Sequence, residues 1–126
     1  MAQIKKFSNP LFLLAIIIIG AFWIRQYRIN IPLGDWHSWR QVDTAAVSRN
    51  FIKEGFDFLH PKYDDMAPVS EDGRPNPNRF RFVEFPIYSG MVALIYSLMG
   101  RVEVIDGRHL SVAFSLLSTV FLYLLV

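Results

Sequence analysis

The sequence predicts an all-α integral membrane protein with two transmembrane helices and a large loop between them. Two long runs without a charged residue, Phe7 to Ile24 and Leu110 to Val126, carry this prediction. The composition agrees, since 52% of the 126 residues are hydrophobic, 19% are charged, and the mean hydropathy is +0.27. This composition excludes a disordered tail, and a net charge of +2 argues against nucleic acid as a partner.

The first predicted span covers residues 8–27. Its centre is apolar on every helical face, as a lipid environment requires. Lys5 and Lys6 precede it, as in a signal peptide, but bulky Phe22 and Trp23 stand where cleavage would need small residues. We therefore expect an uncleaved anchor.

The second predicted span covers residues 108–126 and ends without the flanking polar residues that usually close a span. We therefore expect the chain to be the N-terminal piece of a larger membrane protein. Two spans place both chain ends on one side of the membrane and residues 28–107 on the other. Basic residues occur on both sides of the first span, so charge alone does not orient the protein.

Within this loop, the first predicted helix runs from Val42 to Glu54. The segment contains no Gly or Pro, and Gly55 follows where a C-terminal cap is expected. At 100° per residue, Asp43, Asn50 and Glu54 fall on one narrow stripe, which predicts a carboxylate-bearing face.

Residues 60–86 carry five of the seven prolines and many Asp and Asn residues, so no regular structure is expected there. The second predicted loop helix follows, from Ile87 to Met99, with Pro86 at its start and Gly100 at its end. It is too short to span a membrane. A helix on the membrane surface or packed against other spans fits it better than a core helix.

Polar and aromatic side chains are densest from Asp35 to Thr44, soon after the first span. One interpretation is an interfacial belt made by the tryptophans, with solvated charges around them. The other is an anion-binding site with a base beside it. In that case His37 and Arg40 hold a phosphate, and Asp43 or Asp35 accepts a proton from a substrate hydroxyl.

Other chemistry finds little support in the sequence. There is no cysteine, no Walker-type loop and no H-E-x-x-H or G-x-S-x-G motif. The acidic group Asp64, Asp65, Glu71 and Asp72 lacks EF-hand spacing and is expected to be a solvated turn. Glu84 precedes a helix start, where a carboxylate is favoured by the helix dipole alone.

Three segments together resemble a known family. They are Trp39 to Ala45 (WRQVDTA), Glu84 to Tyr88 (EFPIY) and Gly107 to Ser111 (GRHLS). This order, behind an N-terminal anchor, is similar to the amino-terminal region of the family 39 type of GT-C superfamily glycosyltransferases, which includes ArnT and dolichyl-phosphate-mannose-protein mannosyltransferase-like enzymes. In the commoner family pattern an Asp-Glu pair opens the first loop helix, whereas Arg40 and Gln41 stand there in this chain.

The resemblance implies a GT-C-like N-terminal fragment of a multi-span inner-membrane enzyme. Such an enzyme transfers a sugar from a polyprenyl-phosphate carrier to an acceptor glycan, lipid or protein at the outer face. It implies a cytoplasmic N-terminus, an extracytoplasmic loop over residues 28–107, and two loop helices lying along the membrane. No cofactor is expected; a divalent metal occurs in some relatives, but nothing in this sequence indicates one.

For the site, the resemblance favours Asp43 as the catalytic base, with Asp35 as second choice. It implies substrate binding by His37, Arg40, Gln41, Glu84 and Tyr88. The isolated fragment is expected to be inactive. The alternative to this family is a small non-enzymatic two-span membrane protein whose external loop binds a partner.

Overall fold

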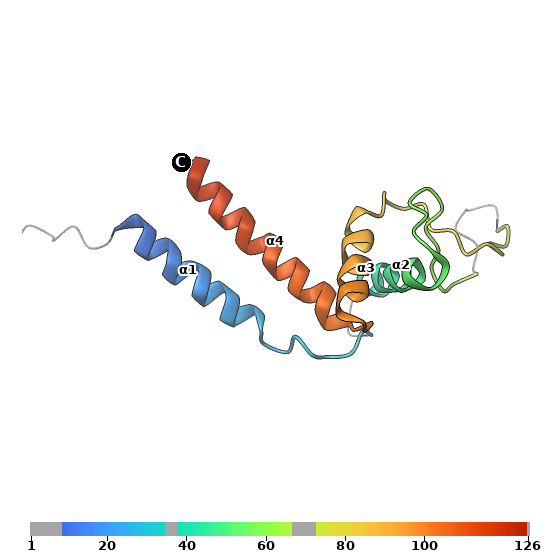
Figure 1. The fold of residues 1–126 in the computed structure, drawn as a ribbon, viewed down its shortest axis with the longest axis horizontal. Coiled ribbons are helices and arrows are strands. Elements are labelled where there is room, and N and C mark those ends of the chain that lie inside the picture. Colours follow the sequence, from blue (N-terminus) through green and yellow to red (C-terminus); the bar gives the residue numbers. More distant parts are fainter. Residues whose placement is uncertain (1–8, 35–37, 67–72, 126) are drawn as a thin grey trace, which may run out of the picture. The chain divides into compact units, whose positions relative to one another are not determined.

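The computed structural model describes residues 9–34, 38–66 and 73–125, and these form an all-helical chain (Figure 1). The described residues contain four α-helices: α1 (Pro10–Arg25), α2 (Trp39–Glu54), α3 (Ile87–Met99) and α4 (Val104–Leu125). The predicted helical class is therefore confirmed. The chain divides into two compact units, one made of Met1–Asn30 with Arg108–Val126 and the other of Ile31–Gly107.

The helix α4 is long and apolar enough to cross a membrane. It has 22 residues, and none of its most apolar 18-residue window is buried inside the protein. It starts at Val104, four residues before the predicted span, because Val104 to Gly107 add a first turn with Asp106 at its dipole-favoured position.

The helix α1 is apolar but shorter. Asn9 caps it by accepting a hydrogen bond from the backbone N–H of Leu11, and Pro10 supplies its first residue. Its 16 residues are fewer than the about 20 that cross a bilayer without tilt. The first of the two predicted spans therefore stays a prediction.

Polar side chains near one end of α1 and α4 bond within this first unit. Arg25 donates to the hydroxyl of Ser115 at 3.0 Å, and Arg108 donates to the carbonyl of Ile29 at 2.6 Å. His109 lies 3.3 Å from the side-chain oxygen of Gln26. Side-chain hydrogen bonds of this kind can join helices where lipid offers no polar partner.

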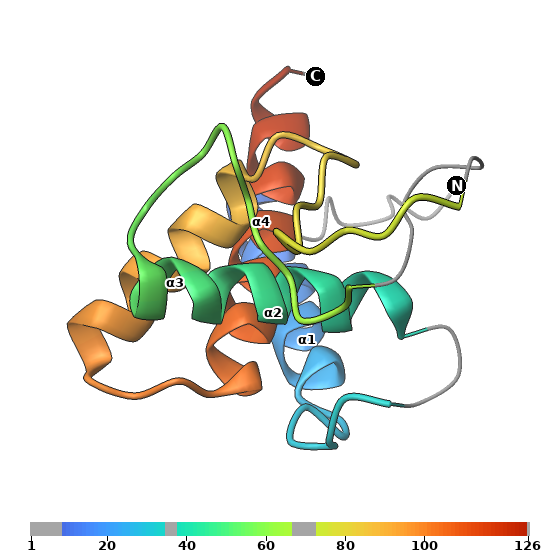
Figure 2. The same cartoon turned by 90° about the vertical axis from the view of Figure 1, so that its right-hand side faces the viewer.

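In the second unit α2 lies against α3 (Figure 2). The buried hydrophobic residues come from α2, from α3 and from one loop tyrosine: Ala46, Val47, Phe51, Tyr63, Val92, Ala93 and Tyr96. Ala93 and Gly90 on α3 have a small side chain or none, so neighbouring residues can approach this helix closely. A methyl group added to Gly90 would lie 2.6 Å from the ring of Phe58.

The bounds of α3 are those predicted, and α2 ends at Glu54 as predicted. Gly100 closes α3 with a left-handed φ of 64°, a conformation that costs a glycine little. The start of α2 was predicted three residues too late. The helix begins at Trp39, with Ser38 as its N-cap, and the carbonyl of Ser38 accepts from the N–H of Val42.

The segment between α2 and α3 contains no helix or strand in its described residues, as predicted. An isolated bridge joins Lys62 and Phe80, so the segment folds back on itself. Backbone hydrogen bonds from Tyr63 to Arg79 and from Arg81 to Pro61 extend this contact. The described parts of this connection therefore reach the polar stripe of α2, where Lys62 bonds with Asn50 and Glu54.

Candidate functional site

A cleft of about 300 Å³ lies in the second unit, where the first turns of α2 and α3 meet the returning loop. Its lining combines apolar residues with two arginines and two carboxylates. The lining residues are Trp39, Arg40, Asp43, Thr44, Val47, Pro61, Arg81, Val83, Glu84, Pro86 and Ser89. Three of the predicted site residues, Arg40, Asp43 and Glu84, are therefore brought together.

Asp43 is held by an arginine from the loop. Nη2 of Arg81 donates to Oδ2 of Asp43 at 2.5 Å, and both side chains are mostly shielded, with exposures of 29% and 23%. The Arg81 guanidinium also lies 5.1 Å from the ring centroid of Tyr63, within cation–π range. The carboxylate predicted as the base is thus part of a fixed, charge-assisted pair.

Arg40 and Glu84 form a second, more open pair. Nη2 of Arg40 donates to Oε2 of Glu84 at 2.6 Å, while their side chains are 78% and 56% exposed. An exposed ion pair of this kind contributes little stability and exchanges readily with solvent or ligand. The N-cap residue of α3 is Pro86, two positions after Glu84, and it makes no side-chain hydrogen bond.

Two predicted site residues lie away from the cleft lining. Gln41 is exposed on α2, and the hydroxyl of Tyr88 donates to the carbonyl of Gly107 at 2.6 Å, so it ties α3 to the first turn of α4. Asp35 and His37 lie outside the described residues.

The sequence reasoning missed Arg81, Thr44 and Ser89. For Arg81 a signal existed, because basic and aromatic residues alternate from Arg79 to Phe82, a period of two that is typical of an extended segment with one polar face. Matching this face with the carboxylates on the α2 stripe would have suggested the pair. The two small hydroxyl residues carry no comparable signal.

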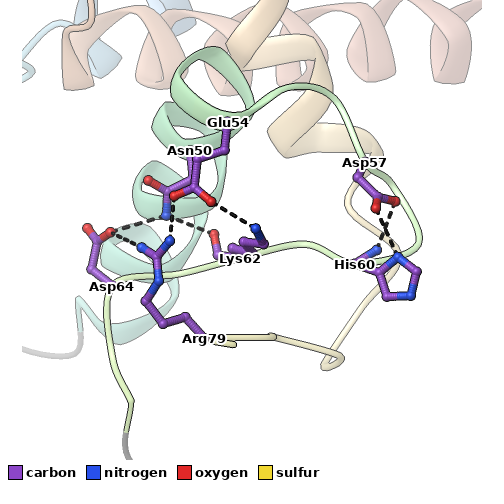
Figure 3. A network of polar contacts seen from close by, with 7 residues as sticks. All are labelled: Asn50, Glu54, Asp57, His60, Lys62, Asp64 and Arg79. Atoms are coloured by element: carbon purple, nitrogen blue, oxygen red, sulfur yellow. Dashed lines mark hydrogen bonds and ion pairs between the residues drawn. The ribbon is translucent and has the colours of Figure 1, made fainter. Parts of the chain in front are cut away.

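Next to the cleft, a polar network fixes the loop against the second half of α2 (Figure 3). Buried Asn50 donates to the carbonyl of Lys62 at 3.0 Å and to Oδ1 of Asp64 at 3.1 Å. Glu54 accepts from Lys62 at 2.9 Å and from Arg79. These hydrogen bonds lower the pKa of the Glu54 carboxyl below its ordinary value of 4.5, with Arg79 the larger cause.

Asp64 is exposed, as expected for a solvated acidic turn, with 45% of its side chain accessible. It also forms ion pairs with Arg49 and Arg79 besides its bond to Asn50. The reason is the basic and amide side chains that α2 and the loop place around it. Asp65, its neighbour, is exposed, and Glu71 and Asp72 lie outside the described residues.

A second, smaller group closes the turn after α2. Asp57 accepts from the backbone of Leu59 and His60 and lies 2.9 Å from Nδ1 of His60. The pKa of the Asp57 carboxyl is lowered, chiefly by the His60 ring. In the described part of the chain no three His, Cys, Asp or Glu side chains are grouped so that they could hold a metal.

Comparison with known proteins adds no relative, since no family model, curated protein or solved structure matches this chain.

Proposed function

We propose that this chain contributes the external-loop site of a membrane glycosyltransferase that uses a polyprenyl-phosphate sugar as donor. The observation that carries the proposal is the grouping of Asp43, Arg40 and Arg81 in one cleft, with a carboxylate and two guanidinium groups. The resemblance of the WRQVDTA segment that begins at Trp39 supports the same assignment. We further propose that α1 and α4 both span the membrane and that the loop faces the outer side.

The proposed chemistry needs only a base and a phosphate site from this cleft. Asp43 takes the proton of the acceptor hydroxyl, and the acceptor oxygen bonds to the anomeric carbon of the sugar. The bond between that carbon and the phosphate oxygen breaks, and its electron pair stays on the lipid phosphate. Arg40 then stabilises the developing charge through a charge-assisted hydrogen bond.

The exposure of the Arg40 pair suits this role. Because Glu84 is 56% exposed, its carboxylate can turn into water when a phosphate takes its place on Arg40. The apolar part of the lining, which includes Val47, Pro61 and Val83, keeps water away from one wall of the cleft. Arg40, at 78% exposure, would bind the phosphate at the solvent-exposed edge of this cleft.

The test is Asp43→Asn, made in the protein as its host membrane contains it. Removing a general base lowers the rate by about 10²- to 10⁴-fold, so kcat for sugar transfer should fall by that amount. Asp57→Asn is the matched control, since it makes the same chemical change in an exposed turn outside the cleft and should leave transfer unchanged.

Two results would count against the proposal at different levels. Undiminished transfer in both Asp43→Asn and Asp35→Asn would show that neither carboxylate is the base. A wild-type protein that transfers no sugar from any polyprenyl-phosphate donor would refute the transferase assignment itself.

A specific observation keeps the second candidate, a partner-binding loop, in consideration. Phe82, Val83 and Phe85 follow each other closely beside the cleft, and each is about 60% exposed, at 63%, 59% and 62%. Exposed apolar residues gathered in this way commonly mark a contact surface. An antibody against residues 25–108 separates the two functions. A host-membrane band several times larger than 14.6 kDa favours the multi-span transferase, and a band at 14.6 kDa favours the binding protein.

A further inference from the structure

We infer that Arg81 is a positioning residue for Asp43, holding one carboxylate oxygen so that the other is aimed at the acceptor hydroxyl. This inference rests on the proposed function, because it assigns Arg81 a part in the same reaction. It adds a residue that was not among the site residues predicted from the sequence or from the family resemblance.

Arg81 is itself held firmly. Its backbone N–H donates to the carbonyl of buried Pro61 at 2.8 Å, and the preceding residue, Phe80, pairs with Lys62. Its guanidinium lies against the ring of Tyr63, which is 6% exposed and belongs to the core. A side chain fixed at its backbone and along its length can impose a direction on the group that it binds.

The bonding of Arg81 differs from that of the neighbouring arginine. Arg79 pairs with two carboxylates, Glu54 and Asp64, and so joins the loop to α2. Among the described residues Arg81 has one carboxylate, Asp43, and its buried Nε has no hydrogen-bond partner. Among the described residues the Nε of Arg49, which pairs with Asp64, is also buried without a partner, so what distinguishes Arg81 from Arg79 is its single carboxylate.

The ion pair with Arg81 also gives the two carboxylate oxygens of Asp43 different roles. Oδ2 accepts from Arg81, which leaves Oδ1 to receive the proton of the acceptor. Rotation of the carboxylate about its last bond would exchange the oxygens, and the bond to Arg81 opposes that rotation. Orientation of this kind affects the rate of the chemical step more than the binding of either substrate.

The first experiment compares Arg81→Gln and Arg81→Lys in host membranes. Misplacement of a reacting group by about 1 Å can cost about 10²-fold, so Arg81→Gln should lower kcat by about 10- to 100-fold and leave KM for both substrates within about twofold. Lysine keeps a cation and one donor, so Arg81→Lys should recover a large part of the loss. An unchanged kcat in Arg81→Gln, or a loss confined to KM, would overturn the inference.

The second experiment tests whether Arg81 acts through Asp43. If it does, Arg81→Gln should have no further effect once Asp43 is already Asn, because the group it positions is gone. A merely structural role predicts the opposite, since damage to the fold would lower the residual activity of Asp43→Asn by the same factor as in the wild type. Equal factors in the two backgrounds would therefore refute positioning.

A chemical readout separates this inference from the proposed function and does not need substrate. A carbodiimide with an amine nucleophile modifies accessible carboxylates, and peptide mass spectrometry reports each site. In folded Arg81→Gln the modification of Asp43 should be several-fold faster than in the wild type, with Glu54 and Asp57 unchanged. Equal modification of Asp43 in both proteins overturns the positioning role even if transfer is observed. Faster modification with no transfer in the wild type refutes the function and leaves the Arg81 contact standing.

Discussion

Asn50 offers the sharpest test of how the loop is held on α2. Its side chain belongs to a residue that is 4% exposed, and its Nδ2 donates to the Lys62 carbonyl and to Oδ1 of Asp64. Replacement by alanine removes both hydrogen bonds and leaves a small void. We therefore expect Asn50→Ala to weaken the attachment of the loop to α2 far more than the small size of the lost side chain suggests.

The magnitude follows from the two bonds. A typical hydrogen bond contributes about 0.5–1.5 kcal/mol net, and the bond to Asp64 belongs at the lower end because water can replace it at that exposed carboxylate. Together with the void, the loss is about 2–3 kcal/mol. That corresponds to an opening equilibrium about 30- to 150-fold larger.

The absence of native cysteine allows a direct assay. Ser48→Cys places one thiol at a fully buried position on α2, with little change in volume. Its reaction rate with a thiol reagent, measured in a detergent micelle or nanodisc, reports how often the unit opens. Asn50→Ala should raise this rate by the factor given above. Lys53→Ala, an exposed change on the same helix, should alter the free energy of opening by less than about 0.5 kcal/mol.

The reasoning would be refuted if Asn50→Ala and Lys53→Ala gave the same labelling rate. That result would mean that the Asn50 contacts contribute no net stability and that the hydrophobic core alone holds the loop.

Two further predictions concern the same unit. Because Arg79 and Lys62 lower the folded-state pKa of the Glu54 carboxyl below 4.5, its ion pairs stabilise the protein above that pH and lose their effect as the pH falls through the folded pKa. The stability difference between wild type and Glu54→Gln, from urea unfolding, should therefore be largest near neutral pH and shrink below pH 4.5; a difference that stays constant with pH would contradict this. Tyr88→Phe should cost about 1 kcal/mol in the same measurement, because it removes the bond to the Gly107 carbonyl. A higher KM for the donor without a loss of stability would instead place Tyr88 in substrate binding.

The elements of this fold that have local signals could be predicted from the sequence. Pro86 and Gly100 fixed both ends of α3, and Gly55 fixed the end of α2, because each acts on the backbone at its own position. The start of α2 also has a sequence signal that the prediction did not use, since Ser38 and Gln41 have the spacing of a capping box. In the structure Ser38 is the N-cap of α2 but makes no side-chain cap bond.

The pairs that build the cleft are of another kind. Asp43 and Arg81 are 38 positions apart in the sequence, and Arg40 and Glu84 are 44 positions apart. No helical or strand periodicity connects positions so far apart, because the chain leaves the regular pattern of α2 after Glu54 for a proline-rich loop. The sequence could show that Asp43, Asn50 and Glu54 share a face of α2, but the partners on the loop depend on how the chain returns.

The return of the loop links the stability of the unit to the geometry of the cleft. Arg79 and Arg81 stand two positions apart on one short segment of the loop, in which Arg79 adopts a left-handed φ of 59°. Arg79 binds Glu54 near the end of α2, and Arg81 binds Asp43 near its start. The anchoring network and the candidate base are therefore set by the same short stretch of backbone. A displacement of that stretch along α2 would break both contacts at once. The separation of Asp43 and Glu54 along the rigid helix therefore determines where the loop lies on α2.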